Sequence, residues 1–124
     1  SALRTLAQRK GAPSAAAREN GAVEEVYRLV AAHYGENIGL EWLAERVGLS
    51  PNYLSSLFKS ESGQGVTQYL SAYRMEKAKQ LLLQTNLRIA DIGKSVGYPN
   101  TSYFCQQFKR FFGVTANSMR ENGE

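Results

Sequence analysis

The sequence is poor in the residues that hold disulfides and metal ions. Its 124 residues include one cysteine, Cys105, and one histidine, His33. One thiol cannot form an intramolecular disulfide, and it suits a reducing compartment such as the cytoplasm, where we expect the protein to act. One Cys and one His are too few for a zinc site of the usual Cys/His kind, so we expect no metal, no other cofactor and no small-molecule ligand.

Long apolar runs are also missing. The opening SALRTLAQRK has no apolar h-region, so we expect no secretory signal. No apolar run approaches the roughly 20 residues that a membrane span needs, and we expect no membrane partner.

The excess of positive charge is small and unevenly spread. The formal net charge of +4 is compatible with a polyanionic partner. Residues 1–21 hold four basic side chains and one acidic side chain, whereas residues 22–124 hold 11 basic and 10 acidic side chains. The main part of the chain could therefore bind nucleic acid only if the fold gathers its basic side chains together. The charge balance alone leaves the class of partner open.

Strand-like alternation is absent, and apolar residues recur instead at the three- and four-residue spacings of helices. The sequence therefore predicts an all-α fold of about seven helices. The stretch GAPSAAARENG, residues 11–21, is typical of a flexible linker. We expect residues 1–21 to be a linker or the end of a missing upstream domain, and residues 22–124 to form the folded domain.

One segment occurs twice in related form. Residues 47–59 read VGLSPNYLSSLFK, and residues 96–110 read VGYPNTSYFCQQFKR. Each copy places a glycine, Gly48 or Gly97, where a sharp turn between two helices would need a positive φ. Ser50 in the first copy has the hydroxyl of a helix N-cap and is followed by Pro.

The repeat predicts two helix-turn-helix units, at about residues 23–65 and 84–120, joined by a helix at about residues 66–83. The second helix of each unit should turn an apolar side inward. That side consists of Leu54, Leu57 and Phe58 in the first copy and of Phe104, Phe108 and Phe111 in the second. Tyr53 and Tyr103 are expected to support helix packing, with phosphate contact as the less favoured alternative.

The opposite side of each second helix carries short polar groups that can form hydrogen bonds at DNA base edges. The candidate base-contacting residues are Asn52, Ser55, Ser56, Thr101, Ser102, Cys105 and Gln106. Candidate phosphate-contacting residues lie near the ends of the same helices. They are Ser50, Lys59, Asn100, Lys109 and Arg110. Each of these side chains could instead be ordinary solvated helix surface.

Two segments carry a family pattern: LEWLAERVGLSPNYLSSLFKSESGQGVTQYLSAYRMEKAKQLL, followed by IADIGKSVGYPNTSYFCQQFKRFFGVT. In this order and spacing they resemble the DNA-binding domain of the AraC/XylS family of bacterial transcription regulators, over residues 23 to about 120. The closest version is the one at the C-terminus of certain two-component response regulators. The resemblance implies two recognition helices in successive major grooves of double-stranded DNA, about 34 Å apart.

The resemblance also implies partners beyond DNA. We expect a transcription activator that contacts RNA polymerase and takes its signal from an upstream sensor or receiver domain. Arg74 matches an arginine of the family's central helix, and we expect it to form an internal ion pair. Trp42 lies off the inward side of its helix, which leaves open whether it packs on a neighbouring helix or marks a surface for another domain or for polymerase.

The chain departs from the family pattern near its C-terminal end. Ala116 and Met119 stand where the family usually has Pro and Tyr, and Gly93 stands where Ala is usual. We therefore expect looser packing in the second unit. The recognition positions are also short of arginine, the commonest base-contacting residue, so specificity could depend on water and DNA shape.

Two other classes of function are alternatives to DNA binding. A helical protein-interaction module could contact polymerase or another regulator without reading DNA. An enzyme, for instance one that uses Cys105 as an acceptor, is not expected, because the sequence has no paired carboxylates, Cys–His pairing or phosphate-cradling glycine loop. A redox switch at Cys105 would lack a resolving cysteine.

Overall fold

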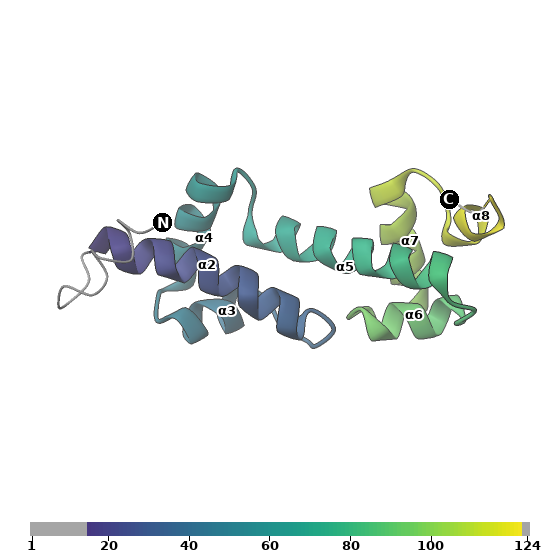
Figure 1. The fold of residues 1–124 in the computed structure, drawn as a ribbon, viewed down its shortest axis with the longest axis horizontal. Helices are drawn as coiled ribbons and strands as arrows, with labels where there is room; N and C mark the ends of the chain where they lie inside the picture. The colour runs from purple at the N-terminus through teal and green to yellow at the C-terminus, as the bar shows by residue number, and fades with distance from the viewer. Residues whose placement is uncertain (1–14, 123–124) are drawn as a thin grey trace.

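The computed structural model describes residues 15–122, and this part of the chain contains helices and no strands (Figure 1). The helices are α2 (Ala15–His33), α3 (Leu40–Val47), α4 (Pro51–Ser62), α5 (Val66–Gln84), α6 (Ile89–Ser95), α7 (Thr101–Phe112) and α8 (Ala116–Asn122). The predicted all-α fold is confirmed. Helix α5 runs along the long axis of the molecule, with α2, α3 and α4 around its first half and α6, α7 and α8 around its second half. None of the described helices is apolar over a length that would cross a bilayer.

Helix α2 begins earlier than the sequence analysis predicted. It starts at Ala15 and continues through Gly21, so residues 15–21 are helical. Residues 15–20 read AAAREN, and the strong helix propensity of Ala, Arg and Glu offsets the cost of one glycine, about 1 kcal/mol relative to alanine. The remaining residues of the predicted linker, 1–14, lie outside the described residues.

Two hydrophobic cores share α5. The first core joins α2, α3 and α4 to the start of α5; its members include Val26, Leu43, Leu54, Phe58 and Leu70. The second core joins α6, α7 and α8 to the rest of α5; its members include Met75, Ala78, Ile92, Phe104 and Phe108. Phe58 and Phe108 are each fully buried, which stabilises the fold by about 1.5–3 kcal/mol apiece. Because both cores depend on α5, this helix ties the two units together.

The inner side of α7 differs by one residue from the prediction. Phe111, which the sequence analysis placed inward, is 45% exposed. Phe112 packs against the second core instead, with its ring centroid 4.6 Å from that of Phe108. The inward-facing residues of α7 are therefore Phe104, Phe108 and Phe112, which are spaced four apart. Phe111 lies beside this row of side chains. In α4, Leu54 and Phe58 are buried as predicted, while Leu57 is half-buried.

Gly93, Ala116 and Met119, the three departures from the family pattern, are all buried in the second unit. Looser packing of this unit stays a prediction. Gly93 lies against the side chain of Phe104, where an added Cβ would come within 2.9 Å of the ring. The absence of a side chain at this position thus allows α6 and α7 to approach closely. Ala116 and Met119, which depart from the family pattern, are both buried in the second core.

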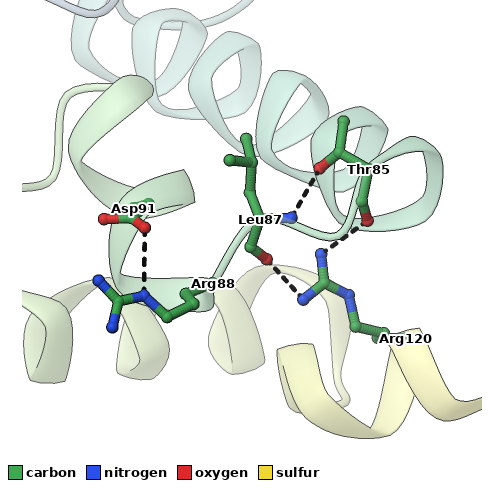
Figure 2. A network of polar contacts seen from close by, with 5 residues as sticks. All are labelled: Thr85, Leu87, Arg88, Asp91 and Arg120. Atoms are coloured by element: carbon green, nitrogen blue, oxygen red, sulfur yellow. Dashed lines mark hydrogen bonds and ion pairs between the residues drawn. The ribbon is translucent and has the colours of Figure 1, made fainter.

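Arg120 fastens α8 to the end of α5. Its guanidinium donates hydrogen bonds to the carbonyl oxygens of Leu82, Thr85 and Leu87, at 3.1, 3.1 and 2.7 Å. Figure 2 shows the bonds to Thr85 and Leu87, with the Arg88–Asp91 ion pair beside them. These carbonyls lie in the last turn of α5 and just after it, where backbone acceptors lack helical partners. Arg120 therefore holds α8 against the C-terminal end of α5.

Candidate nucleic-acid interface

The turn between the helices of each unit has the geometry that the sequence predicted. Gly48 has a φ of 76° and Gly97 a φ of 105°, values that favour glycine. In the first turn the Leu49 N–H donates to the carbonyl of Ala44 at 3.0 Å. In the second turn the Tyr98 N–H donates in the same way to the carbonyl of Gly93, at 2.7 Å.

Helices α4 and α7, which follow these turns, begin and end alike. Each has 12 residues. The Ser50 hydroxyl accepts a hydrogen bond from the Tyr53 N–H at 3.2 Å, and the Asn100 side-chain oxygen accepts one from the Tyr103 N–H at 2.9 Å. Both helices close on a glycine with positive φ, at residues 63 and 113. The side-chain caps orient the N-terminus of each helix, where free backbone N–H groups can face a phosphate.

The outer sides of α4 and α7 carry the predicted contact residues at matching positions. On α4, Asn52, Ser56 and Lys59 are exposed and Ser55 is half-buried. On α7, the residues fifty positions later are Ser102, Gln106, Lys109 and Cys105, and all four are exposed. Spacings of three, four and seven residues put each set on one side of its helix. The structure thus brings the predicted residues into two equivalent polar surfaces.

The other predicted residues lie at the rims of these surfaces. Ser50 and Asn100 are exposed even though their side chains cap the two helices. Arg110 is exposed near the end of α7. Thr101 is half-buried and corresponds to Pro51 of the first unit, so it has no polar counterpart on α4.

The two surfaces lie near opposite ends of α5. In Figure 1, α4 and α7 both run from the side of the molecule where α3 and α6 lie towards the other side. Helix α5 has 19 residues, which corresponds to a length of about 28 Å at 1.5 Å per residue. This length is close to one turn of B-DNA, about 34 Å. The arrangement is that of two similar units repeated along one axis.

Charge is segregated along the chain. Residues 22–45, in α2, α3 and the loop between them, hold one basic and five acidic side chains. Residues 46–122 hold ten basic and four acidic side chains, and α7 has two basic side chains and no acidic one. The low net charge of the folded part therefore averages an acidic segment, residues 22–45, and a basic segment, residues 46–122, that includes the second unit.

Within the described residues, the clearly shifted pKa values belong to side chains of α2 and of the start of α5. A side-chain hydrogen bond from Arg28 lowers the pKa of Glu25, at the exposed surface of α2. Burial raises the pKa of Tyr69, with Tyr73 and Tyr27 close by. Within residues 15–122, no group of three or more His, Cys, Asp or Glu side chains is placed to hold a metal ion.

Tyr53 and Tyr103, for which packing was the favoured role and phosphate contact the alternative, lie at the surface. The two residues are 43% and 52% exposed, which leaves the alternative of phosphate contact open. Each occupies the third position of its helix, where its own N–H is bound by the cap. A phenol at this place can donate a hydrogen bond to a DNA phosphate.

Trp42 packs within the first unit. Its ring lies 5.2 Å from that of His33 on α2, and the Arg46 guanidinium stacks 4.4 Å from its centroid. The structure therefore favours the packing role among the alternatives that the sequence left open. Arg74, for which an ion pair was expected, instead donates hydrogen bonds to the carbonyl oxygens of Tyr34 and Glu36.

Comparison with known proteins identifies relatives of this arrangement. A family model described as a helix-turn-helix domain matches residues 43–122. The regulatory protein PocR of Salmonella typhimurium is 35% identical over 99 residues, which cover 80% of this chain and 33% of PocR. This chain therefore spans about a third of the length of that protein.

Two solved structures have the same fold along most of their length. The C-terminal domain of the two-component response regulator yesN from Fusobacterium nucleatum is 36% identical, with a TM-score of 0.78, over 81% of this chain and 98% of that one. The C-terminal domain of AraT, a response regulator from Geobacillus stearothermophilus, is 37% identical, with a TM-score of 0.80, over 82% of this chain and 84% of that one.

Proposed function

This chain belongs to the AraC-type helix-turn-helix family, and we propose that it binds double-stranded DNA sequence-specifically to regulate transcription. The observation that carries the proposal is the pair of equivalent polar surfaces on α4 and α7, near opposite ends of α5. The family is a class of DNA-binding domain and not a class of enzyme. We accordingly propose that the chain acts by binding alone, without catalysing a reaction.

The two helices would enter successive major grooves on one side of the duplex, because one turn of DNA and the length of α5 are similar. Base edges would be read by the short polar side chains on the outer sides of the helices. These are Asn52, Ser55 and Ser56 on α4 and Thr101, Ser102, Cys105 and Gln106 on α7. Short side chains reach only bases that come close to the helix, so DNA shape and bridging water would contribute to specificity.

Phosphate contacts would set the register of the protein on the duplex. The residues proposed for this role are Ser50, Lys59, Asn100, Lys109 and Arg110, together with Tyr53 and Tyr103. Helix α7 has two basic side chains near its C-terminal end and α4 has one, so we expect the second unit to provide the larger electrostatic contribution.

We further propose that the chain works as the output domain of a longer bacterial regulator. The yesN and AraT domains that it resembles are both C-terminal domains of response regulators. A receiver or other sensor domain would then control when the output domain binds, and contact with RNA polymerase would turn binding into activation. Such a regulator would act in the cytoplasm, where bacterial DNA lies.

Selection of binding sites from a random duplex pool tests the proposal. We expect a bipartite site of about 16–20 base pairs, with two recognised blocks about one helical turn apart. Gln106→Ala should relax the base preference in one block only, and Ser56→Ala in the other, as measured by fluorescence anisotropy on single-base variants of the site. Binding without base preference, or no enrichment at all, would contradict sequence-specific recognition and favour a protein-interaction module.

A further inference from the structure

The two units meet beside α5 as well as through it. The loop that follows α2 in the first unit lies against the turn that follows α6 in the second. A Cβ added at Gly35 would come within 2.5 Å of the Ser95 carbonyl oxygen, and one added at Gly97 within 2.9 Å of the Tyr34 carbonyl oxygen. Backbone therefore touches backbone across the boundary between the units.

Arg74, in the middle of α5, lies at this boundary. Its Nε donates a hydrogen bond to the Tyr34 carbonyl oxygen at 2.7 Å, and its Nη2 donates one to the Glu36 carbonyl oxygen at 2.8 Å. The same guanidinium also lies close to the second unit. Its Cζ lies 5.5 Å from the centre of the Tyr98 ring, and a Cβ at Gly97 would come within 2.7 Å of Nε.

The guanidinium suits this position for chemical reasons. It is planar and permanently charged, so it can donate to two carbonyls along its edge while an aromatic ring and a glycine pack against it. A lysine ammonium could replace one of the hydrogen bonds but could not pack as a planar group against the Tyr98 ring and Gly97. A cleft of about 410 Å³, lined in part by Arg74 itself, lies between the units. Its lining includes Leu40, Leu70, Arg74, Pro99 and Tyr103.

We propose that Arg74 and the backbone contact of Gly35 with Ser95 form a clasp that sets the spacing and relative rotation of the two recognition helices. The inference rests on the proposed DNA binding and identifies Arg74 as a positioning residue, which would act on specificity without touching DNA. With the clasp closed, the protein accepts one separation between the two recognised blocks. With the clasp open, bending of α5 and opening of the cleft let the helices adapt to other separations.

The expected effect follows from DNA geometry. One inserted base pair moves one block by about 3.4 Å and rotates it by about 35° around the duplex axis. A rigid pair of helices cannot follow both changes. We expect such an insertion to weaken binding of the unsubstituted protein about tenfold or more, as loss of one good base contact would.

The DNA experiment compares Arg74→Gln and Gly35→Ala with matched controls. The selected duplex and versions with one base pair added or removed between the blocks serve as probes, with Kd measured by anisotropy. In both variants we expect the loss on insertion to shrink to about threefold or less, whereas affinity for the original site falls only modestly.

Arg120→Gln removes three comparable hydrogen bonds within the second unit, and Gly39→Ala adds a methyl group where no heavy atom lies within 4 Å. Both controls should keep the tenfold preference.

A second experiment tests the clasp without DNA. Cys105 on α7 is the chain's own cysteine and is exposed, and Ser56→Cys adds an exposed labelling site on α4. Spin labels at these two positions report the distribution of distances between the helices by pulsed electron resonance. We expect a narrow distribution in the otherwise unsubstituted chain and a clearly broader one after Arg74→Gln or Gly35→Ala, with circular dichroism showing that each variant is folded.

The outcomes separate the two proposals. If the distribution broadens but no duplex is bound selectively, the clasp stands and the proposed function fails. If the distribution of spin-label distances stays as narrow in both variants as in the chain with Arg74 and Gly35, the clasp is refuted whatever the DNA results. Unchanged spacing preference in both variants, with selective binding intact, refutes it equally.

Discussion

Replacing Gly48 and Gly97 by alanine, one at a time, tests how differently the two equivalent turns are packed. Both glycines have positive φ, 76° and 105°. A Cβ at Gly48 would meet no heavy atom within 4 Å, whereas one at Gly97 would lie 2.7 Å from Arg74 Nε and 2.9 Å from the Tyr34 carbonyl oxygen. The same substitution therefore strains the backbone in both turns but creates a collision only in the second.

The magnitudes follow from these two effects. A positive φ costs alanine about 1–2 kcal/mol. The restricted freedom of alanine in the unfolded chain offsets about 0.4–1 kcal/mol of this cost. We therefore expect Gly48→Ala to lower the free energy of unfolding by about 1 kcal/mol. Overpacking adds about 1–3 kcal/mol at Gly97, so we expect Gly97→Ala to lower the free energy of unfolding by about 3 kcal/mol.

Urea titration followed by far-ultraviolet circular dichroism measures both losses, provided that the slope of the transition is unchanged. Gly39→Ala is the matched control, since Gly39 has extended backbone with φ of −163° and open space around it. It should lower the free energy of unfolding by no more than about 0.5 kcal/mol, because the restricted freedom of alanine in the unfolded chain favours folding where the backbone is unstrained. Equal losses for Gly48→Ala and Gly97→Ala would show that the second turn is not packed against Arg74, and would refute the reasoning.

Two further predictions concern the recognition helices. Ser50→Ala and Asn100→Ala each remove a helix cap and should lower the free energy of unfolding by about 1 kcal/mol in urea titration. Ser60→Ala, at an exposed position inside α4, should change it by less than about 0.5 kcal/mol, and an equal loss there would contradict the capping argument. Lys59→Gln and Lys109→Gln should each reduce the slope of log K against log salt concentration by about 1, measured by anisotropy. Unchanged slopes would show that these lysines contact no phosphate.

Much of the fold could be predicted because its signals are local. The spacing of apolar residues identified the helices, and the repeated glycine turn identified the two units before any contact was known. Ser50 was predicted as a cap from its hydroxyl and the following proline, and the structure confirms it. Such features depend on residues within a few positions of one another, which a sequence displays directly.

The candidate site was predicted in part for the same reason. The side of α4 and α7 that faces outward follows from helical periodicity, and the structure leaves most of the predicted polar residues exposed. Whether each of them contacts a base or a phosphate remains a prediction. For Tyr53 and Tyr103 packing was favoured over phosphate contact, because aromatic side chains are usually buried. Only the fold shows that both residues are exposed.

By itself the sequence determined the helices, their turns and their duplication, because short-range backbone and side-chain chemistry specifies these wherever the segment lies. The tertiary structure alone decided that Phe112 and not Phe111 packs against the second core, which atoms Arg74 binds and how the two units meet. These depend on residues some forty positions apart, such as Arg74 and Tyr34, whose contact distance is set by the packing of whole helices and by no local pattern.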